Sequence, residues 1–385
     1  MDLKLSDNNI NENYPGFNEI WNHRPELQNW SSSSWWFFLL LPKQKTGYGP
    51  KQMMFTYASR VGKEISVNKV WQKGMHLNRK REPDEFMTTV VGWINDGQHV
   101  HEEIVHQPSL ARLSQNQWLE AWDEEEKYGA SIHASKEKEL EINAKFEGKE
   151  GYARFKIWTD PKSEFSQPQI TDIRAVDNKL GGTHLVAWRR INFSGEFKHP
   201  CGTEQLEGIG YFQRVCMNVP MFPWKWLWVA FEDGNVFSMF IPYFGSHIFR
   251  RNDNFYNPIL ERTKFNLMPT SYFYDYTNEK EYVFSKIDIL PIGKNGKIDR
   301  YKPQFTVYAE NDKGDYIKFI INAHGHAQFL LNRRVIKRLW ETKFNYNEFM
   351  VKVEKLQGKL GDLQLPYKNM GEGWGNLEYT WGLSI

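Results

Sequence analysis

One strand-like segment, Glu207–Val215, combines side chains that could transfer a proton. Side chains alternate between the two faces of a strand, so Glu207, Tyr211 and Gln213 share one face. In an apolar cavity the pKa of Glu207 would be raised, and its carboxyl could act as a general acid while Tyr211 and Gln213 orient a substrate. The alternative is an ion pair between Glu207 and a basic residue across the sheet, and the sequence leaves both open.

A second segment, Trp224–Phe231, places three indoles on one side of a strand. Trp224, Trp226 and Trp228 occupy alternate positions and therefore share a face. Such a face could line a large apolar binding site, although aromatic stripes on strands also form ordinary core. Aromatic residues make up 16% of the chain, which favours a β-rich protein and a large apolar ligand.

Two pairs of histidines have the spacing of residues on one strand face, His99 with His101 and His324 with His326. Two imidazoles at this spacing can share a metal ion. Solvated or hydrogen-bonded histidines give the same pattern, and the spacing supplies no third ligand. We therefore expect no metal and no other cofactor.

Charge and motifs exclude several classes of function. The chain has 49 basic and 47 acidic side chains, a balance that argues against a nucleic-acid partner. It contains no phosphate-binding loop, no dinucleotide fingerprint after a strand and no nucleophile elbow. Two cysteines and a polar N-terminus without a signal-peptide core predict a soluble, cytoplasmic protein. The most apolar run, Trp35–Leu41, is too short to span a bilayer, and contact with a membrane surface for substrate pickup stays open.

Alternation of polar and apolar residues recurs through almost the whole chain, and no long helical pattern interrupts it. One-sided hairpins such as Lys138–Phe146 with Tyr152–Trp158 are typical of antiparallel sheets and barrels. The break at Pro220–Pro223 separates two such series. We therefore predict an all-β fold of two antiparallel β-barrel domains, 1–219 and 220–385. Between the strands, Asp160–Gly182 is expected to be a long polar loop.

Three segments together resemble the hydroxyneurosporene synthase family, which contains carotenoid hydratases and AttH-like proteins. They are Trp35–Phe38 near the start, Leu206–Arg214 with Pro223–Gly234 in the middle, and Gly371–Gly382 at the end. The segments occur in the family's order and span most of the chain. The resemblance implies two lipocalin-like barrels packed side by side, with a hydrophobic pocket for an isoprenoid, carotenoid or polyene. With the tryptophan pattern, it gives the predicted substrate-binding residues: Trp35, Trp36, Trp224, Trp226, Trp228, Arg214 and Glu378.

The chain departs from the family where its hydratases carry an Asp-His pair after a Gly-Tyr. Gln213 and Arg214 stand at the matching positions, and neither side chain can protonate an alkene at neutral pH. We expect a cofactor-independent enzyme that cyclises, hydrates or isomerises a hydrophobic isoprenoid or polyene, with Glu207, Tyr211 and Gln213 as catalytic residues. Two mechanisms stay open: protonation by a buried carboxyl, and a pericyclic reaction in which the pocket only folds the substrate into a reactive conformer. A carrier that binds a lipid or pigment without converting it is the alternative. An enzyme using an acid requires a buried carboxyl, whereas a carrier needs an apolar site throughout.

Overall fold

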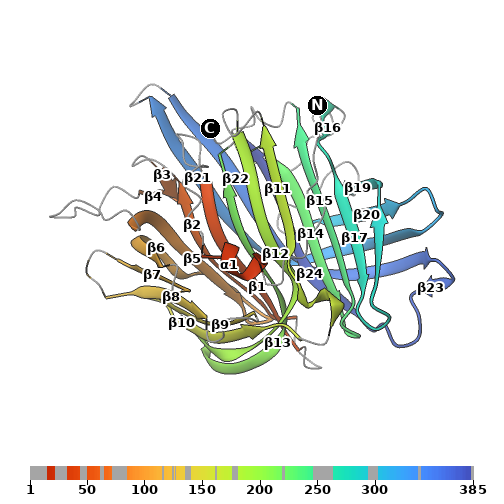
Figure 1. The fold of residues 1–385 in the computed structure, drawn as a ribbon, viewed down its shortest axis with the longest axis horizontal. Coiled ribbons are helices and arrows are strands. Elements are labelled where there is room, and N and C mark those ends of the chain that lie inside the picture. The colour runs from red at the N-terminus through yellow and green to blue at the C-terminus, as the bar shows by residue number, and fades with distance from the viewer. Residues whose placement is uncertain are drawn as a thin grey trace. The chain divides into compact units, whose positions relative to one another are not determined.

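The computed structural model consists almost entirely of β-strands (Figure 1). It describes residues 15–21, 33–43, 50–60, 65–71, 85–114, 117–123, 125, 127–134, 140–160, 163–175, 181–218, 222–245, 263–293, 302–336 and 340–382. Within these ranges no helix is long and apolar enough to cross a membrane. The chain divides into two compact units, Met1–Pro220 with Arg333–Leu339 and Ile385, and Met221–Asn332 with Trp340–Ser384.

Among its described residues, the first unit contains one short helix, one 3-10 helix and the first thirteen strands. They are α1 (Pro15–Glu19), β1 (Ser33–Pro42), β2 (Gln52–Arg60), β3 (Ile65–Val67), β4 (Val70–Trp71), β5 (Glu85–Asn95), β6 (Val100–Ser114), β7 (Trp118–Trp122), β8 (Gly129–Ala134), β9 (Glu141–Glu147), β10 (Tyr152–Trp158), η3 (Glu164–Ser166), β11 (Gln169–Ala175), β12 (Gly181–His199) and β13 (Gly202–Met217).

The sheet of the first unit closes on itself. Its 11 strands follow the order β10-β9-β8-β7-β6-β5-β2-β1-β13-β12-β11, and β10 also pairs with β12. The long β12 makes this possible because its first part pairs with β11 and its second part with β10. Closure pairs the edges that an open sheet would leave exposed. Inside the barrel lies an aromatic core, in which the rings of Phe38 and Phe212 stack at 4.6 Å.

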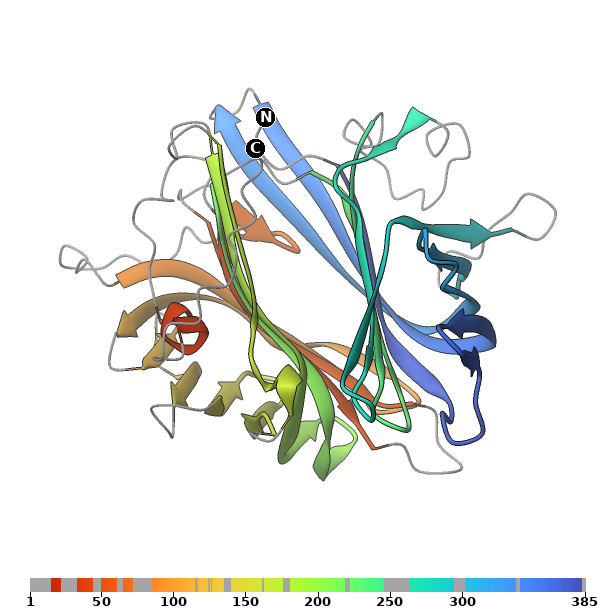
Figure 2. The same cartoon turned by 45° about the vertical axis from the view of Figure 1, so that its right-hand side comes forward.

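The remaining strands begin at Trp224. They are β14 (Trp224–Phe231), β15 (Val236–Phe244), β16 (Phe265–Asn266), β17 (Thr270–Asp275), β18 (Lys280–Phe284), β19 (Lys286–Ile292), β20 (Gln304–Glu310), β21 (Tyr316–Ile336), β22 (Trp340–Leu360), β23 (Leu363–Leu365) and β24 (Gly373–Gly382). Their main path follows the order β18-β17-β15-β14-β24-β22-β21-β20-β19. Two strands of this path, β21 and β22, are long blue neighbours in Figure 2. The second sheet is barrel-like and nearly closed, so the predicted all-β class with two barrels is confirmed.

The two faces of the second sheet differ in composition. Leu227, Val229 and Phe231 of β14 belong to the hydrophobic core of this unit, as do Leu377 and its alternate neighbours on β24. Alternation therefore turns the tryptophans of β14 to the opposite face, together with the even-numbered side chains of β24. This opposite face carries the site described below.

The expectation of a polar loop over Asp160–Gly182 is wrong for 163–175 and 181–182, while 161–162 and 176–180 lie outside the described residues. The 3-10 helix η3 begins there, with the hydroxyl of Ser163 accepting the N–H of Phe165, and β11 follows. β11 is polar in sequence, yet it pairs with β12 from Gln169 opposite Ala187 to Ala175 opposite Gly181. Backbone hydrogen bonds to the long neighbouring strand β12 stabilise β11 as a strand, although its side-chain pattern does not predict one.

Candidate active site

Two glutamates lie opposite each other on neighbouring strands of the second sheet. β22 and β24 are antiparallel, and their register pairs Glu348 with Glu378. Directly opposite residues have Cβ atoms about 4.5–5.5 Å apart, so the two carboxyls lie side by side on one face. Glu348 is 0% exposed and Glu378 is 5% exposed. A buried carboxyl pair is uncommon because each charge loses its hydration.

Neighbouring side chains hydrogen-bond to both carboxyls. The indole N–H of Trp224 donates to Glu378 Oε2 at 2.5 Å, and the hydroxyl of Tyr346 donates to Glu378 Oε1 at 2.5 Å. The side-chain amide of Asn376 donates to Oε2 of Glu348. Glu348 Oε1 is buried and has no hydrogen-bond partner among the described residues. This oxygen is therefore the free position of the pair.

The environment favours the protonated form of both acids. Burial raises the pKa of Glu348 to about 7, against the opposing effect of the nearby Tyr346 hydroxyl and of the hydrogen bond from Asn376. Burial, and then the charge of Glu348, raise the pKa of Glu378 well above its ordinary value. Because two adjacent carboxylates cannot easily ionise together, the pair retains a proton at neutral pH. It can thus serve as a general acid.

Aromatic rings surround the pair. The register places Trp226 opposite Glu378 and Trp228 opposite Asn376, and both indoles are buried. Trp224 is partly buried and packs against Phe344 and Tyr346, with ring centroids 5.2 and 5.7 Å away. We call this region the Trp–Glu face and define it by five side chains: Trp224, Trp226, Trp228, Glu348 and Glu378.

Glu207 lies in a very different environment, and the expectation of a buried acid there is wrong. Its side chain is 66% exposed and lies 2.7 Å from the ammonium of Lys43. The hydrogen bond and charge of Lys43 lower the pKa of Glu207. Strand β1 ends at Pro42 opposite Gly208, so Glu207 lies just past the end of its neighbour, where water reaches it. The alternative expectation, an ion pair between Glu207 and a basic residue, is the one that the structure shows, with Lys43 as the partner.

Tyr211 and Gln213 share a face of β13, as alternation requires. The hydroxyl of Tyr211 donates to Gln213 Oε1 at 2.9 Å, and the Tyr211 ring packs edge-on against Phe37. Glu207 belongs to the same alternation but lies at the solvated end of the strand. The three predicted catalytic residues therefore do not converge on a shared buried acid.

Trp36 and Arg214 occupy the interior of the first barrel. The indole of Trp36 donates to the carbonyl of Ile20, and the guanidinium of Arg214 lies 3.7 Å from the centre of the Trp36 ring. Arg214 also donates to the hydroxyl of Ser34 at 2.7 Å. Both side chains are held by core contacts, whereas Trp35 alternates to the other face and is partly buried. The predicted substrate-binding set is thus divided among three faces: the interior of the first barrel, the opposite face of β1 with Trp35, and the face of the second sheet that carries Glu378 and the tryptophans of β14.

The two histidine pairs behave differently. His326 lies 3.0 Å from Asn347 Oδ1 and stacks on Phe349. Burial, followed by nearby lysine charges, lowers the pKa of His324 to about 4, so its imidazole is neutral. Across the described part of the chain, no group of three ligating residues includes either of them. His101 does join such a group, which is taken up below.

Glu348 is the residue of the candidate site that the sequence analysis does not single out. It follows Asn347 in the run Phe344–Met350, and alternation places it on the same strand face as Phe344 and Tyr346. The available signal is this single carboxyl on an otherwise aromatic face. Only the register with Glu378 reveals the pair.

Comparison with known proteins identifies relatives in fold. No model of a known protein family matches the sequence, and no curated protein matches it significantly. A candidate AttH from Nitrosomonas europaea superposes with a TM-score of 0.52 at 10% identity, over 94% of this chain and 96% of that one. CghA, solved alone and with Sch210972, gives TM-scores of 0.51 at 11% and 10% identity, over 92% of this chain and 88% of CghA. The likeness is one of fold, and the chain has the lipocalin-like β-barrel architecture of AttH-like proteins.

Proposed function

We propose that this protein is an enzyme that protonates an alkene of a hydrophobic isoprenoid or polyene, using the Glu348–Glu378 pair as general acid. The supporting observation is a buried carboxyl pair with raised pKa values beside three tryptophans. A protonated carboxyl in an apolar setting is a strong enough donor for this step only when it is held close to its substrate. The Trp–Glu face supplies that setting.

The proposed reaction begins with the proton on the carboxyl pair. Transfer of this proton from Glu348 to one alkene carbon leaves a carbocation on the other carbon and a carboxylate on the enzyme. The indoles of Trp226 and Trp228 stabilise the cation by cation–π attraction, worth about 2 kcal/mol for a desolvated contact. Loss of a proton from the product then returns the carboxyl to its starting form. None of these steps oxidises or reduces the substrate, so the proposed reaction requires no redox cofactor.

Three products can arise from the same cation. Capture by water gives hydration, capture by a second alkene of the substrate gives cyclisation, and loss of a neighbouring proton gives isomerisation. The sequence resemblance to the hydroxyneurosporene synthase family supports this substrate class. Among the proteins with similar folds, CghA has been solved with the compound Sch210972, which supports ligand binding by this fold.

A carrier for the same hydrophobic ligands is the competing function. A carrier gains nothing from two adjacent buried carboxyls, because burying them lowers stability unless each is neutralised or paired. The free Oε1 atom of Glu348 is likewise unexplained by a purely apolar site. The carboxyl pair therefore favours the enzyme.

The test has two stages. Mass spectrometry of the hydrophobic compounds that co-purify with the protein identifies candidate ligands. The protein is then incubated in D₂O with those compounds and with a panel of acyclic isoprenoids and polyenes. An alkene-protonating enzyme incorporates deuterium from solvent into its product. A co-purified ligand that stays intact and unlabelled through many hours would establish the carrier instead.

A further inference from the structure

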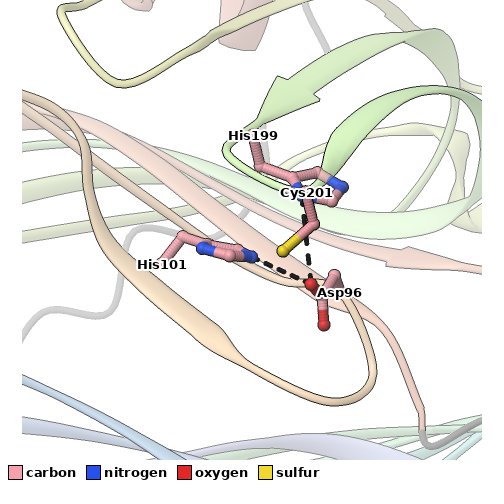
Figure 3. Close-up of side chains that lie close together, drawn as sticks. All are labelled: Asp96, His101, His199 and Cys201. Carbon is pink, nitrogen blue, oxygen red and sulfur yellow. Dashed lines mark hydrogen bonds and ion pairs between the residues drawn. The ribbon is translucent and has the colours of Figure 1, made fainter.

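Two turns of the first barrel bring together four side chains that can bind a metal. Asp96 lies in the turn between β5 and β6, and His101 follows on β6. His199 ends β12, and Cys201 lies in the turn that leads into β13. One ligand atom from each residue lies within 4.8 Å of all the others. Figure 3 shows the sulfur of Cys201 among the side chains of His101, His199 and Asp96.

We propose that Asp96, His101, His199 and Cys201 form a zinc site. Two imidazoles, one thiolate and one carboxylate are a donor set that zinc accepts in tetrahedral geometry. With four protein ligands the coordination is complete, which is typical of a structural rather than a catalytic site.

The carboxylate of Asp96 is already oriented for this role. Its Oδ1 atom accepts the backbone N–H groups of Gln98 and His99, both at 2.8 Å. Oδ2 therefore points toward the histidines, 2.9 Å from His101 Nε2 and 3.9 Å from His199 Nδ1. Ligand atoms around tetrahedral zinc lie about 3.3–3.7 Å apart, given bonds of about 2.0–2.3 Å. The two distances bracket this range, so small side-chain shifts suffice.

The imidazole of His199 gives an independent indication. The residue is 5% exposed, and its Nδ1 atom is buried with no hydrogen-bond partner in the described part of the chain. Its other nitrogen, Nε2, lies 3.1 Å from Glu204 Oε1, and Glu204 also accepts a hydrogen bond from Lys51. A proton on Nε2 donated to Glu204 leaves the Nδ1 lone pair facing the cluster. Metal-binding histidines commonly have such a carboxylate partner on the second nitrogen.

A zinc ion here would tie together parts of the barrel that do not pair directly. In the strand order, β2 and β1 lie between β5 and β13, so these two strands are not hydrogen-bonded neighbours in the sheet. The metal would fix one rim of the first barrel. All four ligands belong to the first unit, and the Trp–Glu face belongs to the second, so this site does not depend on the proposed acid catalysis.

Cobalt(II) titration of metal-free protein tests the site by spectroscopy. The wild type is expected to bind one equivalent, with the intense visible bands of tetrahedral cobalt and a thiolate-to-cobalt charge-transfer band, and zinc should displace the cobalt. Cys201→Ser should abolish the charge-transfer band. Cys201 is exposed, so this variant should fold normally. Cys216→Ala is the matched control, because Cys216 is the chain's other, buried cysteine and lies outside the cluster.

Thermal melting gives a second measurement. Stoichiometric zinc should raise the melting temperature of the wild type and of Cys216→Ala but not that of Cys201→Ser, because a metal bound only by the folded state stabilises it. Weak octahedral cobalt spectra in the wild type would overturn the proposal. An unchanged charge-transfer band in Cys201→Ser would overturn it as well.

Discussion

Glu207 and the Glu348–Glu378 pair present the same functional group in opposite environments. Glu207 lies beyond the end of β1, beside Lys43 and in water, and its pKa is lowered. Glu348 and Glu378 lie in the middle of paired strands, and burial raises both pKa values. All three side chains lie on β-strands. Two things decide whether a glutamate is a protonated buried acid or an ionised partner of a lysine: its position along the paired strands, and the residue opposite it on the neighbouring strand.

The most direct test of this difference is to remove the carboxyl of Glu348 and that of Glu207 in separate variants. Glu348→Gln should lower turnover about 10²–10⁴-fold, which is the usual contribution of a general acid. Glu207→Gln, the matched control, should leave turnover unchanged because its carboxyl is solvated and ion-paired. The rates are compared by solvent deuterium incorporation. Equal loss in both variants, or in neither, would remove Glu348 from the mechanism.

The pH dependence of stability should distinguish the same two sites. The pKa of Glu348 rises from 4.5 to about 7 on folding, so the native state holds a proton there that the unfolded state has released. Stability conferred by this neutral acid is complete below pH 4.5 and falls as the pH rises to about 7. The loss is about 3 kcal/mol, since each unit of pKa shift corresponds to about 1.4 kcal/mol.

Glu348→Gln should make this part of the curve less steep, because an amide has no proton to lose and only the contribution of Glu378 is left. Urea unfolding of the wild type and the variant at several values between pH 4.5 and 7 measures the difference in free energy of unfolding. A decline of the same steepness in both proteins would show that Glu348 is already ionised in the folded state.

A smaller effect is expected from the hydrogen bond between Tyr346 and Glu378. Tyr346→Phe removes a donor that stabilises the ionised carboxyl, so the pKa of Glu378 should rise further. Turnover should fall about tenfold, in line with about 1.5 kcal/mol for a hydrogen bond to a charged group. The alkaline limb of the rate profile should move to higher pH.

Tyr211→Phe is the control for this change, because it also removes one hydroxyl hydrogen bond, the one to Gln213. Its pH profile should coincide with that of the wild type. A shift of the alkaline limb in Tyr211→Phe, with none in Tyr346→Phe, would contradict the proposal and would indicate that the catalytic acid lies in the first sheet.

The sequence predicts local elements well and pairings between distant residues poorly. The strands Gly129–Ala134, Tyr152–Trp158 and Trp224–Phe231 end where alternation and turn residues place their ends. These patterns depend on neighbours a few residues apart. β11 was missed because its formation depends on β12, which offers it a ladder of hydrogen bonds.

The candidate sites are harder still, because they depend on register and barrel closure. Glu378 was among the predicted residues through the family resemblance, yet its partner Glu348 lies 30 positions earlier and is brought to it by the β22–β24 register. The zinc ligands show the same limit. The spacing of His99 and His101 supplies no third ligand, so the sequence predicts no metal there. Of these two histidines only His101 joins the cluster, and the ligands His199 and Cys201 come from a turn nearly 100 residues away.

The smallest expected effect on stability is that of removing the ion pair between Glu207 and Lys43. Its pH dependence is expected to be opposite in sign to that of Glu348. A carboxyl whose pKa is lowered on folding contributes stability above its unfolded pKa and loses it as the pH falls. Glu207 and Glu348 therefore tilt the stability curve in opposite directions. Because Glu207 and Lys43 are both largely exposed, salt screens their attraction, and Glu207→Gln should leave the melting temperature at neutral pH unchanged within error. Melting of this variant in low and high salt checks this expectation. A large drop in melting temperature that depends on salt would show that the Glu207–Lys43 pair contributes substantially to stability, and the contrast with the buried Glu348–Glu378 pair would then be smaller than their exposure indicates.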